Sequence, residues 1–398
     1  MRSNLKVKTV NWSRVDEALI GAAVPPQNSQ TAPGERSSAV FPGAVLLVGQ
    51  GGDIVYCEAA GCRSVVPEVT PMTAEMVFDV SSLTKPVVAA TLAMQLVDRG
   101  LLEVDRRLSH VFQTFGTYGK ERMTVRHLLA HTSGYPATAP FFRMIAKANK
   151  AERIGMSGTR GAIEMIYNEI FRAKLEALPG KVVKYSDLGF ILLGDALEVA
   201  SGTFLDKLAG QSIFRPLGLQ NTGYIDLKTI RRHGLEPAKE RIAPTAHCPW
   251  RGRILCGEVH DDNAWAMGGV SAHAGLFSNV FDLHAFAAEM IACYHGRGIL
   301  VSAETVRRFW RRDETISGSP WALGWEMPVG QRSSCGQYFS EHSVGHLGYT
   351  GCSLWIDPVR EIDVVLLSNQ IHWSTDSRAL LSFRPVIHDL IMEALGFA

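Results

Sequence analysis

The chain has 398 residues, of which 46% are hydrophobic and 20% are charged, and its formal net charge is +1. This composition is ordinary for a globular protein and provides enough residues for two domains or one large one. The near-neutral charge argues against nucleic acid as a partner, and no apolar run reaches the roughly 18 residues of a membrane-spanning helix.

The N-terminus and the cysteines bear on the cellular compartment. Residues 1–8 contain no apolar core of signal-peptide length. The seven cysteines are odd in number, irregularly spaced and free of Cys-x-x-Cys pairs, which is typical of reduced thiols. The sequence therefore predicts a cytoplasmic protein with no membrane segment, and it makes no prediction of the oligomeric state.

The first block of the chain combines helix and strand patterns. Apolar spacing predicts a helix over 10–24. Residues 42–50 and 53–61 are predicted strands joined by a tight turn at Gly51-Gly52. A further helix is predicted to open at Ser82 and to close at about residue 100, where a glycine can end it.

The remaining blocks are first helical and then mixed. Residues 101–240 are rich in helical patterns, whereas glycines and strand patterns return after about residue 265. The clearest predicted elements are helices over 125–131, 188–200, 281–294 and 384–396, and a hairpin of strands over 351–358 and 362–368. This order predicts an α/β domain built from residues 1–80 and 266–398, with a mainly helical domain, 81–265, inserted and a cleft between the two.

The start of the Ser82 helix carries the first candidate chemistry. Ser82 and Lys85 stand three residues apart, so on a helix the amine can lie beside the hydroxyl. A hydroxyl becomes a strong nucleophile when a base takes its proton, and a helix N-terminus stabilises an oxyanion. The pattern is weak by itself, because Ser3-Asn4-Leu5-Lys6 also matches it and because Ser82 could simply cap a helix.

Two distant stretches could supply partners. In Tyr185-Ser186-Asp187, the Tyr185 hydroxyl could relay the serine proton and Asp187 could hydrogen-bond Lys85. The alternative is a core tyrosine followed by a helix N-cap.

The second stretch runs from His346 to Gly351. Gly348 would let a substrate approach the strand edge, and the Tyr349 N–H could face an acyl oxygen. His346 could donate to a substrate carboxylate or to Tyr185. The alternative is a glycine-rich turn with an exposed histidine.

Together and in this order, the three stretches resemble the motifs of the penicillin-recognising serine hydrolases: serine β-lactamases, low-molecular-weight D-Ala-D-Ala peptidases and β-lactamase-like esterases. The family motifs are Ser-x-x-Lys, Tyr-x-Asn, and Lys-Thr-Gly or His-Thr-Gly. They stand here as Ser82-Leu83-Thr84-Lys85, Tyr185-Ser186-Asp187 and His346-Leu347-Gly348. Residues 127–134, 214–219 and 273–278 also resemble this family, so the resemblance covers roughly residues 40–395.

The resemblance implies a β-lactamase/transpeptidase-like fold, α/β plus all-α, with an antiparallel central sheet flanked by helices. It implies Ser82 as nucleophile, Lys85 as its base or proton relay, and Tyr185 as the group that protonates the leaving group and later activates water. The N–H groups of Ser82 and Tyr349 would form the oxyanion hole. No metal or organic cofactor is expected. The implied substrate-binding residues are Asp187, His346, Gly348 and Tyr349.

Two residues depart from the family pattern. Asp187 stands where the family usually has Asn, and a carboxylate that lacked a partner would repel an anionic substrate. His346 stands where β-lactamases have Lys, and a neutral imidazole attracts a carboxylate less strongly. Both changes favour a less anionic ester or amide over a β-lactam.

Three hypotheses follow. The first is a serine hydrolase that acts on a small ester or amide, or on a β-lactam, through a Ser82 acyl-enzyme. The alternative is a D-Ala-D-Ala carboxypeptidase or penicillin-binding protein, or a weak class C-like β-lactamase. The third is a catalytically silent binding protein on the same scaffold, which the filled motif positions disfavour. The chain has no Gly-x-Ser-x-Gly, P-loop or His-Glu-x-x-His pattern.

Several other polar residues have weaker signals. His260, Asp261 and Asn263 are predicted to line the cleft, whereas His131 and His273 are predicted to hydrogen-bond loop backbone. A metal site is a minor alternative, since the spacing fits no usual zinc pattern. Its candidate ligands would be His247, Cys248, Cys256, His260, Asp261 and Asp262.

Overall fold

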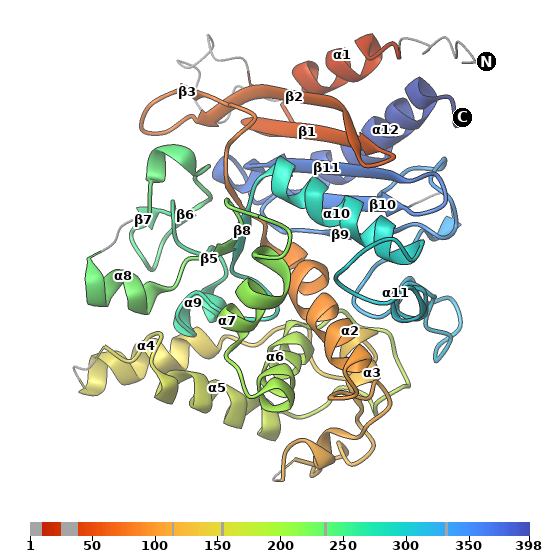
Figure 1. Cartoon of the computed structure of the whole chain (residues 1–398). Coiled ribbons are helices and arrows are strands. Elements are labelled where there is room, and N and C mark those ends of the chain that lie inside the picture. The colour runs from red at the N-terminus through yellow and green to blue at the C-terminus, as the bar shows by residue number, and fades with distance from the viewer. Residues whose placement is uncertain (1–9, 25–38, 114, 153–154, 235–236, 331–332) are drawn as a thin grey trace.

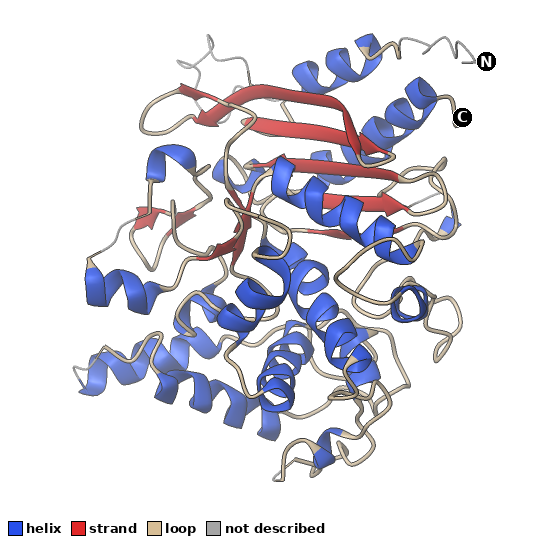
Figure 2. Ribbon diagram, viewed as in Figure 1, coloured by secondary structure: helices blue, strands red, loops and turns tan. Residues whose placement is uncertain are grey.

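The computed structural model describes residues 10–24, 39–113, 115–152, 155–234, 237–330 and 333–398. Its largest sheet has six strands in the order β3-β2-β1-β11-β10-β9, and every neighbouring pair is antiparallel (Figures 1 and 2). The strands are β1 (Gly43–Gln50), β2 (Asp53–Ser64), β3 (Thr70–Pro71), β9 (Val344–Leu347), β10 (Ser353–Asp357) and β11 (Ile362–Ser368). The predicted antiparallel sheet is therefore confirmed, and its centre joins the two ends of the chain.

The central strands are buried on both faces. In β1, Val45 and Leu47 belong to the core that also contains the helices below the sheet. Ala44, Leu46 and Val48 point the other way, into a second core. Side chains alternate along a strand, so a continuous apolar run here predicts a sheet covered on both sides.

Helices supply both covers. α1 (Ser13–Ala22) and α12 (Arg378–Leu395) lie against one face, and α10 (Val280–Tyr294) lies against the other (Figure 1). The closing helix begins at Arg378 and not near residue 384 as predicted, so Pro385 lies inside it. Proline favours the first turn of a helix, but the buried face of α12 outweighs that preference.

The remaining helices lie mostly below this sheet (Figure 1). They are α2 (Thr91–Asp98), α3 (Val125–Leu129), α4 (Phe141–Glu152), α5 (Arg160–Arg172), α6 (Asp187–Ser201), α7 (Leu205–Ala209), α8 (Leu227–His233), α9 (Asp262–Ala266) and α11 (Ala303–Phe309). Two small sheets accompany them, made of β4 (Phe78–Asp79), β8 (Leu276–Ser278) and β5 (Gly223–Tyr224), and of β6 (His247–Cys248) and β7 (Arg253–Ile254). One core joins the sheet to α2, α6 and α10, and the predicted domain boundaries stay a prediction.

The helix predicted to open at Ser82 is broken into three parts. Residues Ser81–Leu83 form a 3₁₀ turn, Lys85–Ala90 a π-helical turn, and α2 follows. Pro86 has no N–H to give to the Ser82 carbonyl, so a regular α-helical ladder cannot form here. At the junction with α2, the Thr91 hydroxyl donates to the Pro86 carbonyl at 3.0 Å.

Across the described residues, no single helix has the length and apolar composition to cross a membrane. The bent pair of Asp187–Ser201 and Leu205–Phe214 passes the same test on length and composition alone.

Candidate active site

Ser82 lies in a tight turn that the backbone would not adopt without support. Ser81 has a φ of 51°, in the left-handed region that non-glycine residues rarely occupy. Its N–H donates to Asp79 Oδ1 at 2.9 Å, and its carbonyl accepts from the Thr84 hydroxyl at 2.6 Å. Strain of this kind is often found at functional sites. Residues three apart in helical backbone lie on one face, so Lys85, just after this turn, is brought beside Ser82.

The Lys85 amine lies in a cage of three oxygen acceptors. Nζ is 3.0 Å from Ser82 Oγ, 2.7 Å from Asp187 Oδ1 and 2.9 Å from the His273 carbonyl. The side chain is fully buried. Burial lowers the pKa of Lys85, but the neighbouring Asp187 and Tyr185 outweigh that effect, so the pKa is raised. The amine is therefore an ammonium whose three protons each have an acceptor, and the predicted contact with Asp187 is present.

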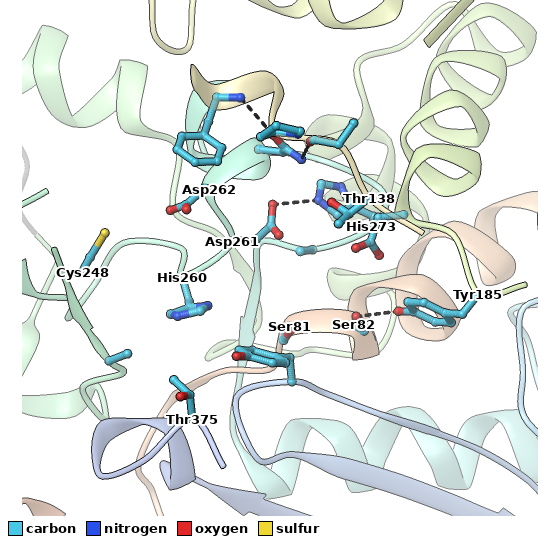
Figure 3. Close-up of a pocket in the computed structure, with 18 of the residues that line it drawn as sticks. Ser81, Ser82, Thr138, Tyr185, Cys248, His260, Asp261, Asp262, His273 and Thr375 are labelled. Atoms are coloured by element: carbon cyan, nitrogen blue, oxygen red, sulfur yellow. Dashed lines mark hydrogen bonds and ion pairs between the residues drawn. The ribbon is translucent and has the colours of Figure 1, made fainter. Parts of the chain in front are cut away.

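Tyr185 contacts the same serine from the other side. Its hydroxyl donates to Ser82 Oγ at 2.8 Å (Figure 3). The ring lies over His131, with centroids 4.5 Å apart. Burial raises the pKa of Tyr185 despite the opposing effect of Lys85, so the hydroxyl keeps its proton. The alternative of a purely structural core tyrosine does not account for the contact with Ser82.

The structure gives His346 a different hydrogen-bonding role from the one predicted. Its Nδ1 is 2.8 Å from the Leu347 carbonyl, so Nδ1 must carry the proton. Burial, together with the Lys85 charge, lowers the pKa of His346 to about 3, and the ring is neutral. Nε2 is buried without a partner among the described residues and presents a lone pair. His346 is therefore an acceptor and cannot donate to a substrate carboxylate.

Gly348 also differs from its predicted role. A Cβ added at this position would lie 2.5 Å from the Val80 carbonyl and 3.2 Å from Cys352 Cβ. The missing side chain thus lets the end of β9 pack against the segment that leads to Ser82, and Gly348 is absent from the cavity lining. In the same turn, Thr350 Oγ1 donates to the Asp79 carbonyl at 2.6 Å. These contacts position Tyr349 at the cavity that Ser82 lines, while the predicted oxyanion hole stays a prediction.

Ser82 opens into a cavity of about 870 Å³ (Figure 3). Five of the seven predicted site residues line it, and the buried Lys85 lies behind the wall. The lining also contains His260, Asp261 and Asn263, as predicted. It further contains residues that the sequence reading missed. The most prominent of these are Phe142, Trp250, Trp321 and Glu326.

His273 contributes more than the predicted structural role. Its carbonyl accepts from Lys85, and its ring bonds side chains: Nε2 is 2.8 Å from Asp261 Oδ1, and Nδ1 is 2.7 Å from Ser271 Oγ. His131, by contrast, accepts from the Ser186 backbone N–H at 3.1 Å, as predicted. The His–Asp pair could have been suspected from His260-Asp261-Asp262, but nothing in the sequence links it to residue 273.

The metal alternative lacks a ligand set in the part of the chain that the structure describes. No group of three or more His, Cys, Asp or Glu residues there could hold a metal ion. His247 and Cys248 line the cavity, whereas the Cys256 thiol contacts the carbonyls of Lys239 and Ile242.

Comparison with known proteins identifies the family. The beta-lactamase family profile matches residues 29–384. A putative D-alanyl-D-alanine carboxypeptidase of Escherichia coli K12 is 31% identical over 360 residues, covering 83% of this chain and 79% of the relative. An N-acetylmuramyl-L-alanine amidase of Bacillus subtilis is 31% identical over 357 residues, covering 84% and 78%.

Solved structures agree on the fold. The hydrolase EstCE1, which has promiscuous acyltransferase activity, superposes with a TM-score of 0.66 at 20% identity and covers 94% of this chain and 100% of its own. The octameric penicillin-binding protein homologue of Pyrococcus abyssi has a TM-score of 0.65 at 23% identity, covering 89% and 73%. With its Ser82 site and this match over most of its length, the chain belongs to the β-lactamase family and is a serine hydrolase of that family.

Proposed function

We propose that Ser82 attacks the carbonyl of an ester or amide and is transiently acylated. The observation that carries the proposal is the convergence on one oxygen: Lys85 Nζ and the Tyr185 hydroxyl lie 3.0 and 2.8 Å from Ser82 Oγ, at the wall of a large cavity. A nucleophile contacted by a proton-transferring group that is itself held by a third group is the usual arrangement for covalent catalysis.

The charge state of the site suggests a relay. Lys85 enters the reaction as an ammonium, so it can take the Ser82 proton only if it passes one of its own to Asp187, 2.7 Å away. The amine stays charged throughout, and the serine proton is in effect transferred to the carboxylate. Tyr185 then donates its proton to the leaving group and regains one from this network. The reverse transfers would activate water for deacylation.

The substrate is proposed to lack a carboxylate next to the scissile bond. The neutral His346 offers a lone pair there, which would repel a carboxylate. A D-Ala-D-Ala peptide and a β-lactam both bring a carboxylate, so they are the second candidate class. That class is supported by the 31% identity to the putative carboxypeptidase of E. coli.

A substrate panel separates the two classes. A short-chain p-nitrophenyl ester, nitrocefin and a D-Ala-D-Ala peptide are offered to wild type and to Ser82→Ala. We expect ester turnover and little turnover of the other two. In the variant, turnover should fall at least about a thousandfold, because the nucleophile is gone. A fluorophosphonate should add its mass at Ser82 only, and undiminished activity of Ser82→Ala would refute the acyl-enzyme.

A further inference from the structure

The cavity extends away from Ser82 on the side opposite Tyr185. In Figure 3, Tyr185 lies on one side of Ser82, and His260 and Asp261 lie on the other. Tyr185 is the proposed proton donor to the leaving group, so the leaving group lies on its side. The acyl group of a substrate must then extend toward α9 and the turn between β6 and β7.

The charged residues that line this cavity are acidic. Its described lining includes four carboxylate residues and neither a lysine nor an arginine. The nearby cations already have partners: Lys85 has its three acceptors, and the buried Arg251 donates to Asp262 and to the carbonyls of Val259 and His260. Asp187 and Asp262 are therefore neutralised by a cation, and a substrate carboxylate would find no lysine or arginine in the described lining.

Two carboxylates remain, Glu326 and Asp261. Burial raises the pKa of Glu326 to about 7, so Asp261 is the one that stays ionised. Its Oδ1 accepts from His273 Nε2 at 2.8 Å and from the Ala264 N–H at 2.7 Å, while Oδ2 has no hydrogen-bond partner among the described residues. Burial alone would raise the pKa of Asp261, but the charge and hydrogen bond of His273 hold it well below its usual range. Asp261 is thus ionised and about one-third exposed, and its one ion-pair partner among the described residues is His273, which contacts Oδ1 and leaves Oδ2 free.

Aromatic rings surround the same region. His260 stacks on Tyr349 with centroids 5.6 Å apart, and Phe142 stacks on Trp250 at 5.3 Å. Aromatic walls next to a carboxylate suit a cation, because ring faces attract positive charge. A purely apolar acyl group would instead desolvate Asp261 and give it no donor, which is unfavourable.

A second, independent observation concerns the leaving-group side. Nε2 of His346 is a buried lone pair without a partner in the described chain, and the residue lines the cavity. It can be satisfied only by a hydrogen-bond donor. Each end of the cavity therefore has an acceptor atom that favours a substrate group able to donate a hydrogen bond.

We infer that this cavity selects acyl donors that carry an ammonium group and lack a carboxylate, and that the free Oδ2 of Asp261 binds the ammonium. The inference rests on the proposed acyl-enzyme at Ser82. It assigns to Asp261 a specificity role that no catalytic step requires, and it names aminoacyl esters or amides with a free amine as the substrate class.

The test is a charge series on one acyl group. Alanine p-nitroanilide with a free amine, its N-acetyl derivative and its N-succinyl derivative differ by one unit of charge each, and both D and L forms are used. We expect kcat/KM to fall about tenfold at each step from ammonium to neutral to anionic, as a charge-assisted hydrogen bond would give. The advantage of the ammonium should shrink in high salt.

Asp261→Asn is the matched variant, because an asparagine keeps the paired oxygen and replaces only the free one. It should reduce the preference for the ammonium over the N-acetyl donor to about twofold. Asp262→Asn removes the same charge from the adjacent residue, whose Oδ1 is held by Arg251 and Trp250, and should keep most of the preference.

The outcomes separate the two proposals. If no donor and no fluorophosphonate acylates Ser82, the proposed function fails. If Ser82 is acylated but the N-succinyl donor reacts as well as the free amine, or the salt dependence is absent, the inference alone fails. An unchanged preference in a folded Asp261→Asn also refutes it, as does a stronger preference for neutral, hydroxyl-rich acyl groups.

Discussion

Ser82 is held from two sides, and the two sides use different chemistry. On the helical side, Lys85, Tyr185 and Asp187 contact the serine or each other through charged and polar side-chain atoms. On the sheet side, Gly348 packs its backbone against the Val80 carbonyl. The first side determines which protons move, whereas the second determines where the nucleophile lies. The two can therefore be broken separately.

Removing a charge from the helical side should reduce stability and turnover more than a change on the sheet side does. Asp187→Ala leaves the fully buried Lys85 ammonium without its anionic partner. We expect the free energy of unfolding to fall by about 3 kcal/mol and ester turnover to fall at least about a hundredfold. Urea denaturation and steady-state rates measure the two quantities.

The pH dependence of that stability loss identifies its source. The pKa of Lys85 is raised in the folded chain, so its contribution is complete below the unfolded pKa of about 10.4 and is lost as the pH rises through the higher folded value. In Asp187→Ala, burial is no longer offset by Asp187, so the unpaired Lys85 can lose its proton more easily. The difference in stability between wild type and variant should therefore be largest at low pH and shrink as the pH rises. The exposed Lys184–Glu176 pair is the control, and Glu176→Ala should cost less than about 1 kcal/mol.

Breaking the sheet side should affect catalysis more than stability. The Cβ of Gly348→Ala would meet the Val80 carbonyl at 2.5 Å, so the β9 turn must move away from the Ser82 segment. We expect kcat to fall roughly tenfold to a hundredfold, since small displacements of a catalytic group are costly. Gly21→Ala is the control: a Cβ there meets nothing within 4 Å. Wild-type turnover in folded Gly348→Ala would contradict this role.

This division also explains what the sequence could predict. Side-chain chemistry leaves motifs, so Ser82, Lys85, Tyr185 and the contact of Asp187 with Lys85 were predictable, as was the antiparallel sheet from its apolar runs. Backbone geometry has no such motif, so the left-handed conformation of Ser81 could not be predicted from the sequence. These features depend on contacts between distant segments, which propensity and spacing do not encode.

His346 and His273 show the same limit for side chains. A histidine at a motif position does not reveal its tautomer, which here follows from the Leu347 carbonyl. The pairing of His273 with Asp261 likewise appears only when α9 and the strand that follows are folded together. The residue types were visible, whereas their donor and acceptor roles were not.

Asp79 contacts both sides of the site. Its protonation should have the smallest effect of these predictions, and the effect should be seen in the pH dependence of kcat. Its carboxylate accepts from the N–H groups of Ser81 and His260 at 2.9 and 2.7 Å, and burial raises its pKa to about 6. Below that pH one oxygen is protonated and can no longer accept, so the Ser81 turn loosens and kcat should fall roughly threefold to tenfold.

Unfolding would not explain that fall. The folded pKa of Asp79 lies above the unfolded value of about 3.9, so this group's contribution to stability increases as the pH falls through 6. Stability and activity should thus move in opposite directions at this residue. Asp79→Asn, neutral at every pH, should have a lower and flatter rate profile. If the acidic limb persists in Asp79→Asn but disappears in Glu326→Gln, then Glu326, whose pKa burial raises to about 7, is the titrating group instead.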